Sequence, residues 1–408
     1  MGKCGVLDIV DFPISTPSAL ISSLTLENIW FCLHPMFGYM DYVQKCFYQS
    51  TQWSEDNSYA NVTETFKNVL DFDVPQGVNL AVSAQSSSNS CTSYKLSNLG
   101  FVSGSVSYLY TTTPLTNVQS TKHVALQNMV TSYKVLEPLR EPRNAKYWEI
   151  WQGGVRVDVR DTLLYGRMFL PGSSLEAMLI RRVSPTVQLL VTCVSDSSLK
   201  NNGALTLTCQ RDNGHWSLEG IYSTHEALVG VRTLYNFAFS KSLPSAELPQ
   251  VGSTSLPSRL SAGFELYYGI LNKAGGASLA ARYTTQSTYT GTPLTLSVLA
   301  NPLMGHLTIS YAVKTAYSTY ASRFDFNIYS YLSDLSLGCE LWRSNKEPAL
   351  STDFSSVIKA STSLGSQTVK VLWEGRFKEL LISSGLGLST AGPSPALTTF
   401  GIQVQYSS

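Results

Sequence analysis

The side chains that could carry acid–base or metal chemistry are few and far apart in this sequence of 408 residues. No two of its five histidines stand at the spacing of metal ligands, and no HExxH motif occurs. These are His34, His123, His215, His225 and His306. We interpret them as isolated polar or loop residues.

Two glutamates stand in similar segments, Glu265 in GFEL at 263–266 and Glu340 in GCEL at 338–341. A pair of carboxylates could act as a general acid and a general base. We interpret them instead as structural acids that face a polar interior and are hydrogen-bonded there. The GxG at 385–387 is followed by Ser, Thr and Pro residues rather than by a helix, so it does not predict a phosphate-binding loop.

The seven cysteines include no CxxC pair and are odd in number, which argues against a disulfide framework. Cys193, Cys209 and Cys339 fall on apolar faces, where cysteine acts as a small hydrophobe. No GxSxG motif is present either. The sequence therefore predicts a protein that is not an enzyme and that holds no cofactor or metal.

The elements that position these residues alternate between apolar and polar side chains. At the C-terminus, Phe400, Ile402, Val404 and Tyr406 share one face of a predicted strand, and Gln403 lies on the other. Charged residues make up 14% of the chain, against about 25% in an average soluble domain. This combination indicates strands with one face toward lipid and the other toward a wet interior.

No apolar run reaches the roughly 18 residues of a membrane-spanning helix. In lipid only a closed barrel satisfies every backbone group of a set of strands. We predict an all-β transmembrane barrel of about 19 strands, similar to porins and the voltage-dependent anion channel, with blurred strands in 62–76 and 90–101. The net charge of +1 does not indicate a nucleic-acid partner.

Three regions are expected along the chain. Residues 1–35 differ from the rest and form an extension that is disordered or a mispredicted start. Residues 36–53 form a helical segment, and residues 54–408 form the barrel, with long loops near 112–155, 238–259 and 343–354. On the helix, Tyr39, Val43, Cys46 and Phe47 share one side and form a predicted pore helix.

Several side chains can be assigned to the inner or the outer face of the wall. Arg282, Lys314 and Asp325 lie on polar faces and are expected inside. Aromatic residues on apolar faces or near strand ends indicate an interfacial girdle: Tyr108, Tyr110, Tyr268, Tyr311, Trp342 and Trp373. Tyr108 and Tyr110 share a face and predict either a partner-facing patch or lipid-facing packing.

Short motifs spread over about residues 36–408 point to one family: YMDYV at 39–43, FYQST at 47–51, NSY at 57–59, LDF at 70–72, GSVSYLY at 104–110, YGRM at 165–168, LEAM at 175–178, NPLMGH at 301–306, FDFNIYS at 324–330, GCELW at 338–342, LWEG at 372–375 and FGIQ at 400–403. With these motifs the chain resembles the fungal mitochondrial distribution and morphology protein 10 family.

The resemblance implies a multi-pass barrel of the mitochondrial outer membrane at contact sites with the endoplasmic reticulum. It further implies membership of the tether between the two organelles, beside lipid-transfer proteins and a subunit of the endoplasmic reticulum membrane. A second implied role is in the sorting and assembly machinery, in late β-barrel assembly. Phospholipid exchange, mitochondrial morphology and mitochondrial inheritance would depend on the protein.

The last strand also resembles the sorting signal of mitochondrial barrels, a polar residue, a glycine and two apolar residues one apart. Thr399, Gly401, Val404 and Tyr406 fit these positions. A two-faced strand with an unpaired edge can be recognised by strand addition.

Two other classes of protein fit the pattern. One is a metabolite or ion channel of the same fold, although the mixed charges expected inside give no strong selectivity. The other is a soluble adhesive β-sandwich, in which the apolar faces would be buried between two sheets.

Overall fold

The computed structural model describes residues 38–98, 102–115, 117–136, 151–152, 155–156, 161–172, 174–196, 202–224, 227–237, 258–286, 292–344, 354–390 and 396–408. The expected N-terminal extension, residues 1–35, lies outside this part of the chain. The loops expected near 238–259 and 343–354 also fall mostly outside it.

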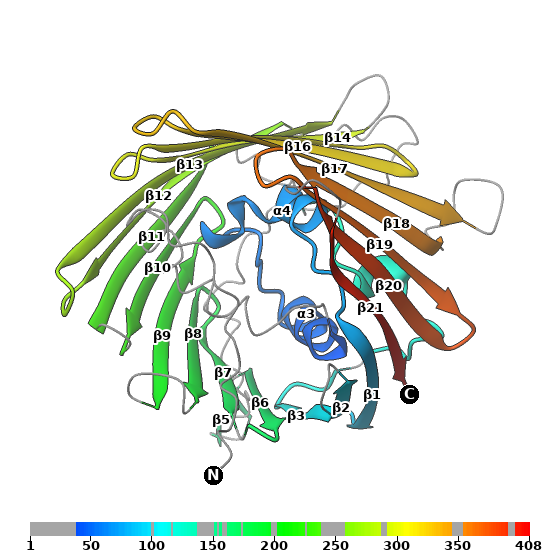
Figure 1. The fold of residues 1–408 in the computed structure, drawn as a ribbon. Helices are drawn as coiled ribbons and strands as arrows, with labels where there is room; N and C mark the ends of the chain where they lie inside the picture. The colour runs from blue at the N-terminus through cyan, green and yellow to red at the C-terminus, as the bar shows by residue number, and fades with distance from the viewer. Residues whose placement is uncertain are drawn as a thin grey trace, which may run out of the picture. The chain divides into compact units, whose positions relative to one another are not determined.

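Nineteen strands pair into one closed sheet (Figure 1). Neighbours along the chain are antiparallel, and the first and last strands pair in parallel to close the ring. The strands are β1 (Gly77–Ser87), β2 (Ser90–Asn98), β3 (Val102–Thr111), β6 (Thr162–Leu170), β7 (Leu175–Ser184), β8 (Val187–Ser195), β9 (Gly203–Asp212), β10 (Trp216–Ser223), β11 (Leu228–Phe237), β12 (Arg259–Gly269), β13 (Ala274–Gln286), β14 (Pro293–Asn301), β15 (His306–Lys314), β16 (Ser318–Asn327), β17 (Ser333–Ser344), β18 (Phe354–Ser363), β19 (Thr368–Phe377), β20 (Leu380–Ser389) and β21 (Ala396–Ser407). The predicted barrel and its strand number are confirmed.

The two faces of the wall differ as the alternation predicts. In β1, Leu80 and Val82 are exposed on the outside, while Ala81 and Ser83 are buried inside. The strand acids all face inward: Glu176, Asp212, Glu219, Glu265, Asp325, Asp334, Glu340 and Glu374. Lipid outside and water inside explain this division, because a carboxylate in hydrocarbon is costly.

The parallel seam between β1 and β21 requires a close approach of two backbones. Gly401 pairs with Gly77, and a Cβ atom on Gly401 would lie 2.5 Å from the carbonyl oxygens of Gly77 and Pro75. No side chain fits in this space, so glycine is needed at position 401.

Two longer helices, α3 (Tyr39–Thr51) and α4 (Glu64–Leu70), lie inside the ring of strands (Figure 1). Shorter elements are η1 (Ala60–Val62), α5 (Leu126–Met129) and a separate hairpin of β4 (Trp151–Gln152) and β5 (Val155–Arg156). Among the helices of the described residues, none has the length and apolar character needed to span a membrane. The strand predicted within 62–76 is wrong, because Phe66, Val69 and Leu70 have helical spacing and are buried on one side of α4.

One member of the predicted girdle is also wrong. Trp342 faces inward and is only 7% exposed, with its ring centroid 5.2 Å from that of Phe354. Its strand neighbours Leu337 and Leu341 face outward, so the strand period places Trp342 inside. The other five aromatic residues are exposed on the outer wall: Tyr108, Tyr110, Tyr268, Tyr311 and Trp373.

Candidate functional site

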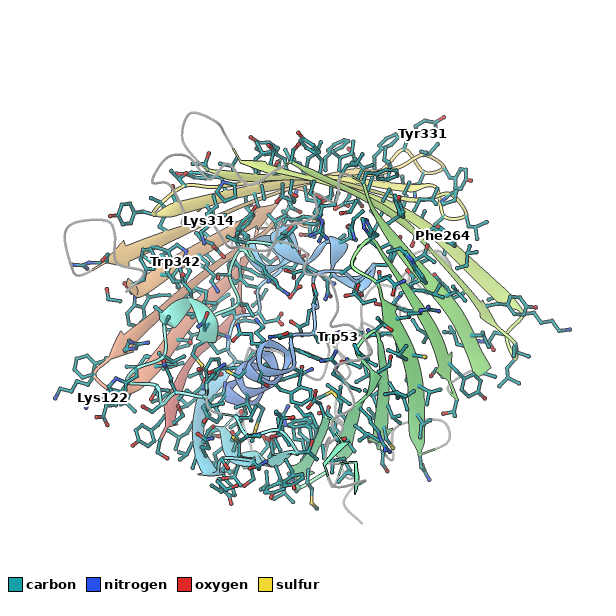
Figure 2. The ribbon with its side chains drawn as sticks, turned by 180° about the vertical axis from the view of Figure 1, so that it is seen from behind. Trp53, Lys122, Phe264, Lys314, Tyr331 and Trp342 are labelled. Carbon is teal, nitrogen blue, oxygen red and sulfur yellow. The ribbon has the colours of Figure 1, made fainter. Side chains whose placement is uncertain are left out.

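The helix α3 is capped at both ends within the barrel. At the N-terminus, the Asp41 carboxylate accepts a hydrogen bond of 2.8 Å from the backbone N–H of Gly38. At the C-terminus, Gln52 adopts a left-handed conformation with φ 57°, and the Trp53 N–H donates to the Tyr48 carbonyl at 3.0 Å. These caps define a helix that begins and ends inside the wall. Trp53 lies in the interior (Figure 2).

The predicted pore-helix side chains all lie on the buried side of α3. Tyr39, Val43, Cys46 and Phe47 are 0–3% exposed. They belong to one apolar cluster with side chains that point inward from β2, β3, β6 and β7: Cys91, Leu109, Leu163 and Ile180. The helix is therefore anchored to this part of the wall by apolar burial.

Residues 112–115 and 117–136, which we call the inner segment, cover α3 from the other side. Leu115, Val124, Leu126 and Met129 are buried in the same cluster as α3. The Tyr42 hydroxyl accepts a hydrogen bond of 3.2 Å from the Gln119 N–H. Sequence reasoning placed these residues in a loop and missed that the segment packs inside the barrel.

The inner segment also reaches the seam of the barrel. The Thr121 N–H donates to the Ser407 carbonyl at 3.3 Å, and the Thr121 hydroxyl donates to the Glu379 carbonyl at 2.6 Å. The Leu115 N–H donates to the Ser88 carbonyl, in the turn between β1 and β2. The segment thus ties the end of β21 and the β19–β20 turn to the β1–β2 turn.

A cluster of charges joins the inner segment to the chain between α3 and α4. The Lys134 Nζ atom lies 2.9 Å from a carboxylate oxygen of Asp56, 3.2 Å from Glu64 and 3.6 Å from Glu55. From β13, Arg282 is 1% exposed and donates to the backbone carbonyls of Asn61 and Asp56. Each of these charges therefore fixes one part of the internal structure against another.

The surroundings of the cluster shift the pKa values of two of its members. Burial alone would lower the pKa of Lys134, but the carboxylates of Glu64, Asp56 and Glu55 together raise it above the ordinary lysine value. Burial raises the pKa of Glu55, and the opposing effect of Lys134 does not fully cancel it. Lys134 therefore stays charged throughout the physiological range.

Charges on β17 and β18 hold the end of the inner segment. Lys359 is fully buried, and its ammonium donates to the Thr131 carbonyl at 2.6 Å and pairs with Glu374 at 2.6 Å. The Glu340 carboxylate accepts a hydrogen bond of 3.4 Å from the Tyr133 N–H.

Glu265 has a separate set of partners on β11 and β13. It pairs with Arg232 at 2.7 Å and accepts a hydrogen bond of 3.1 Å from the Ser278 hydroxyl. The two glutamates considered for acid–base work are thus engaged in different structural interactions. In the described residues, no group of three or more His, Cys, Asp or Glu side chains is placed to hold a metal ion.

The helix α4 packs closely against β15, β16 and β17. A Cβ atom on Gly338 would lie 2.9 Å from a Leu70 methyl and 3.0 Å from the Val69 carbonyl oxygen, so glycine permits this approach. At the end of the helix, Arg323 forms a two-pronged ion pair with Asp71 and contacts Asp325 at 2.9 Å. Asp325 therefore faces the interior, as do Lys314 and Arg282.

The remaining predicted site residues lie on the wall. Thr399 and Gly401 face inward on β21, whereas Val404 and Tyr406 face outward. Tyr108 and Tyr110 are exposed by 51% and 40% on the outside of β3, two strands away from the seam. The structure does not bring the sorting-signal residues of β21 close to Tyr108 and Tyr110.

A closed ring of antiparallel strands with an apolar outer face defines a β-barrel of the kind that resides in membranes. The model of the family "Mitochondrial distribution and morphology protein 10" matches residues 36–353 and 349–408. The chain belongs to this family.

Curated relatives with this same name agree with the match. The protein of Yarrowia lipolytica is 44% identical over 372 residues, which cover 91% of this chain and 99% of the relative. That of Phaeosphaeria nodorum is 44% identical over 393 residues, and that of Sclerotinia sclerotiorum is 40% identical over 404 residues. Each alignment covers 91% of this chain and the full length of the relative.

Proposed function

We propose that this protein is a non-enzymatic docking barrel of the mitochondrial outer membrane that supports mitochondrial distribution and morphology. The names of its relatives support the cellular role. The apolar outer face supports residence in a membrane.

One observation favours docking over transport, namely that α3, α4 and the inner segment pack against the inner wall. A channel needs free polar groups along its path. Here Arg282, Lys359 and Glu340 hold internal backbone groups in place. The inward charges thus stabilise the filling of the barrel, which leaves the outer face and the two mouths for partners.

The complexes that we propose are those of the family resemblance. At contact sites, the barrel anchors the tether between endoplasmic reticulum and mitochondria, together with lipid-transfer proteins and a subunit of the endoplasmic reticulum membrane, and thereby supports phospholipid exchange. In the sorting and assembly machinery it acts in late β-barrel assembly. Loss of such a barrel is therefore expected to disturb mitochondrial morphology and inheritance.

The test is affinity purification from native membranes of a fungal strain in which this chain replaces the resident family member. We expect tether subunits and sorting-and-assembly subunits in separate complexes on native gels. We also expect the tagged chain to resist carbonate extraction and to restore tubular mitochondria. Rescue of morphology without either set of partners would contradict the docking proposal.

Conductance separates the docking barrel from the channel alternative. Purified protein in planar bilayers is expected to show little or no stable conductance. Removal of α3 by deletion of residues 39–51 is expected to raise it. A large, ion-selective conductance of the intact chain would favour the channel instead.

We further propose that Thr399, Gly401, Val404 and Tyr406 act as the sorting signal. Gly401→Ala or Val404→Asp should leave import intact and impair membrane assembly, which native gels of imported protein can show. Thr398→Ala, at an exposed neighbouring position, is the matched control and should assemble normally. Normal assembly of both signal variants would contradict the proposal.

A further inference from the structure

The outward-facing charges of the barrel wall are all of one sign in the described strands. The acids point inward, whereas three arginines point outward and are exposed: Arg181 on β7, Arg211 on β9 and Arg343 on β17. None of the three forms an ion pair with a described acid. Their chemistry therefore suits an anion supplied from outside the chain.

All three arginines lie near the same mouth of the barrel. Arg181 precedes the β7–β8 turn, Arg211 precedes the β9–β10 turn, and Arg343 precedes the connection from β17 to β18. In the antiparallel ring these turns belong to one end, at which β21 also finishes. A long arginine side chain at the edge of an apolar wall can place its guanidinium at the level of the lipid headgroups.

Arg181 and Arg211 form a pair, one on each side of β8. Arg343 has no second arginine beside it. Arg181 is the register partner of Leu189, and Arg211 is the register partner of Val187. From the strand spacing and the rise per residue, their Cα atoms lie roughly 12 Å apart. An anion above the outward faces of Val187 and Leu189 would lie between the two side chains. Arg211 would turn toward it from its place over Trp216, which lies on β10 at the other side of β9.

Apolar and aromatic groups surround the pair. Leu189 and Val187 continue the lipid-facing surface between the two arginines. The Arg211 guanidinium lies 5.3 Å from the centroid of the Trp216 ring, which orients it at the edge of the wall. Two cations on either side of an apolar strip match a molecule with a phosphate at one end and acyl chains at the other.

We propose that Arg181 and Arg211 form a binding site for the phosphate of an anionic phospholipid in the leaflet at this mouth. The apolar strand surface below them receives the acyl chains. The continuity of the site with the lipid-facing wall favours a lipid over free phosphate. This proposal stands independently of the complexes that the barrel joins.

The test is lipid retention by protein reconstituted in phosphatidylcholine vesicles that contain phosphatidylinositol. After mild detergent extraction, native mass spectrometry counts the phospholipids that stay bound. The wild-type chain should retain phosphatidylinositol in preference to phosphatidylcholine. The double variant R181Q/R211Q should lose this preference by about tenfold or more.

Arg343→Gln is the matched control, because it removes an outward arginine near the same mouth where no second arginine lies beside it. It should retain the lipid preference. The double variant R181K/R211K should keep part of it, because lysine preserves the charge but not the two-pronged geometry. Equal losses in R343Q and R181Q/R211Q would overturn the proposal in favour of a general surface-charge effect.

Two further outcomes are decisive. No loss of preference in the folded double variant, checked by its urea unfolding midpoint, would overturn the proposal. Displacement of the lipid by an equal concentration of inorganic phosphate would show that the site recognises free phosphate and would overturn the lipid assignment. If the double variant fails to assemble, R181Q and R211Q are tested singly, and each should lose part of the preference.

Discussion

The two sides of the internal structure are anchored in different ways. On the side of β2, β3, β6 and β7, α3 is held by apolar side chains, among which Val43 and Phe47 are fully buried. On the side of β13 to β18, α4 also buries apolar residues, but the end of the inner segment and the chain before α4 are held by charges, among them Lys134, Arg282 and Lys359. The same barrel thus contains an apolar anchor and an ionic anchor.

The two anchors differ in the geometry that they require as well as in how much they contribute to stability. Apolar burial stabilises in proportion to the area removed from water and is tolerant of small shifts. A buried charge stabilises the fold only in the position where it contacts its partners, because an unpaired charge in the interior is costly. We infer that the apolar anchor of α3 provides most of the stability of the internal packing. The ionic anchor fixes where the inner segment and the chain before α4 lie.

The largest loss of stability is expected when the apolar anchor is weakened. Phe47→Ala removes a ring that is 0% exposed and should lower the free energy of unfolding by about 3–5 kcal/mol. Urea unfolding in detergent, followed by tryptophan fluorescence, measures this change. Gln49→Ala, at an exposed position of the same helix, should change it by less than about 0.5 kcal/mol. Similar values for the two variants would mean that the apolar anchor contributes little.

A smaller effect is expected when the ionic anchor loses its central cation. Lys134→Met leaves Glu55, Asp56 and Glu64 facing one another, and the free energy of unfolding should fall by about 2 kcal/mol, less than for a fully buried pair because Lys134 is 23% exposed. Lys122→Met is the matched control, since its pair with Glu379 is more than half exposed and should contribute less than about 1 kcal/mol. Equal losses would show that the internal cluster is no stronger than a surface ion pair.

The strands and the face of α3 could be predicted because each depends on a local period. In a strand of a lipid-facing wall, every second side chain is apolar and faces outward. In a helix that packs against an apolar wall, the apolar side chains form a stripe, here at Tyr39, Val43 and Phe47. The inward placement of Arg282 and Lys314 followed from the same alternation.

The internal packing could not be predicted in this way. The seven residues of α4 make about two turns, too few to distinguish its period from that of a blurred strand. The inner segment contacts polar walls through partners distant in the sequence, such as Thr121 with Ser407 and Tyr133 with Thr295. Trp342 was misplaced because an aromatic residue near a strand end suggested the lipid interface, although its position in the alternation pointed inward.

The smallest expected effect concerns the pH dependence of the ionic anchor. Because burial raises the pKa of Glu55 in the folded state, its stabilising contribution is complete below the unfolded pKa of about 4.3 and is lost as pH rises through the folded pKa. At neutral pH the ionised Glu55 is thus less favourable in the fold than a neutral side chain. Lys134 adds no dependence below its own pKa, which is raised above the ordinary lysine value.

Glu55→Gln should therefore be slightly more stable than the wild type at about pH 7.5, by less than about 1 kcal/mol, and the two should converge toward about pH 4. Urea midpoints of both proteins across this range measure the difference. Glu379→Gln, at an exposed carboxylate, should show no such convergence. A Glu55→Gln protein that is less stable at neutral pH would mean that the ion pair with Lys134 outweighs the cost of burying Glu55, and the ionic anchor would then contribute more strength than the comparison with α3 assigns to it.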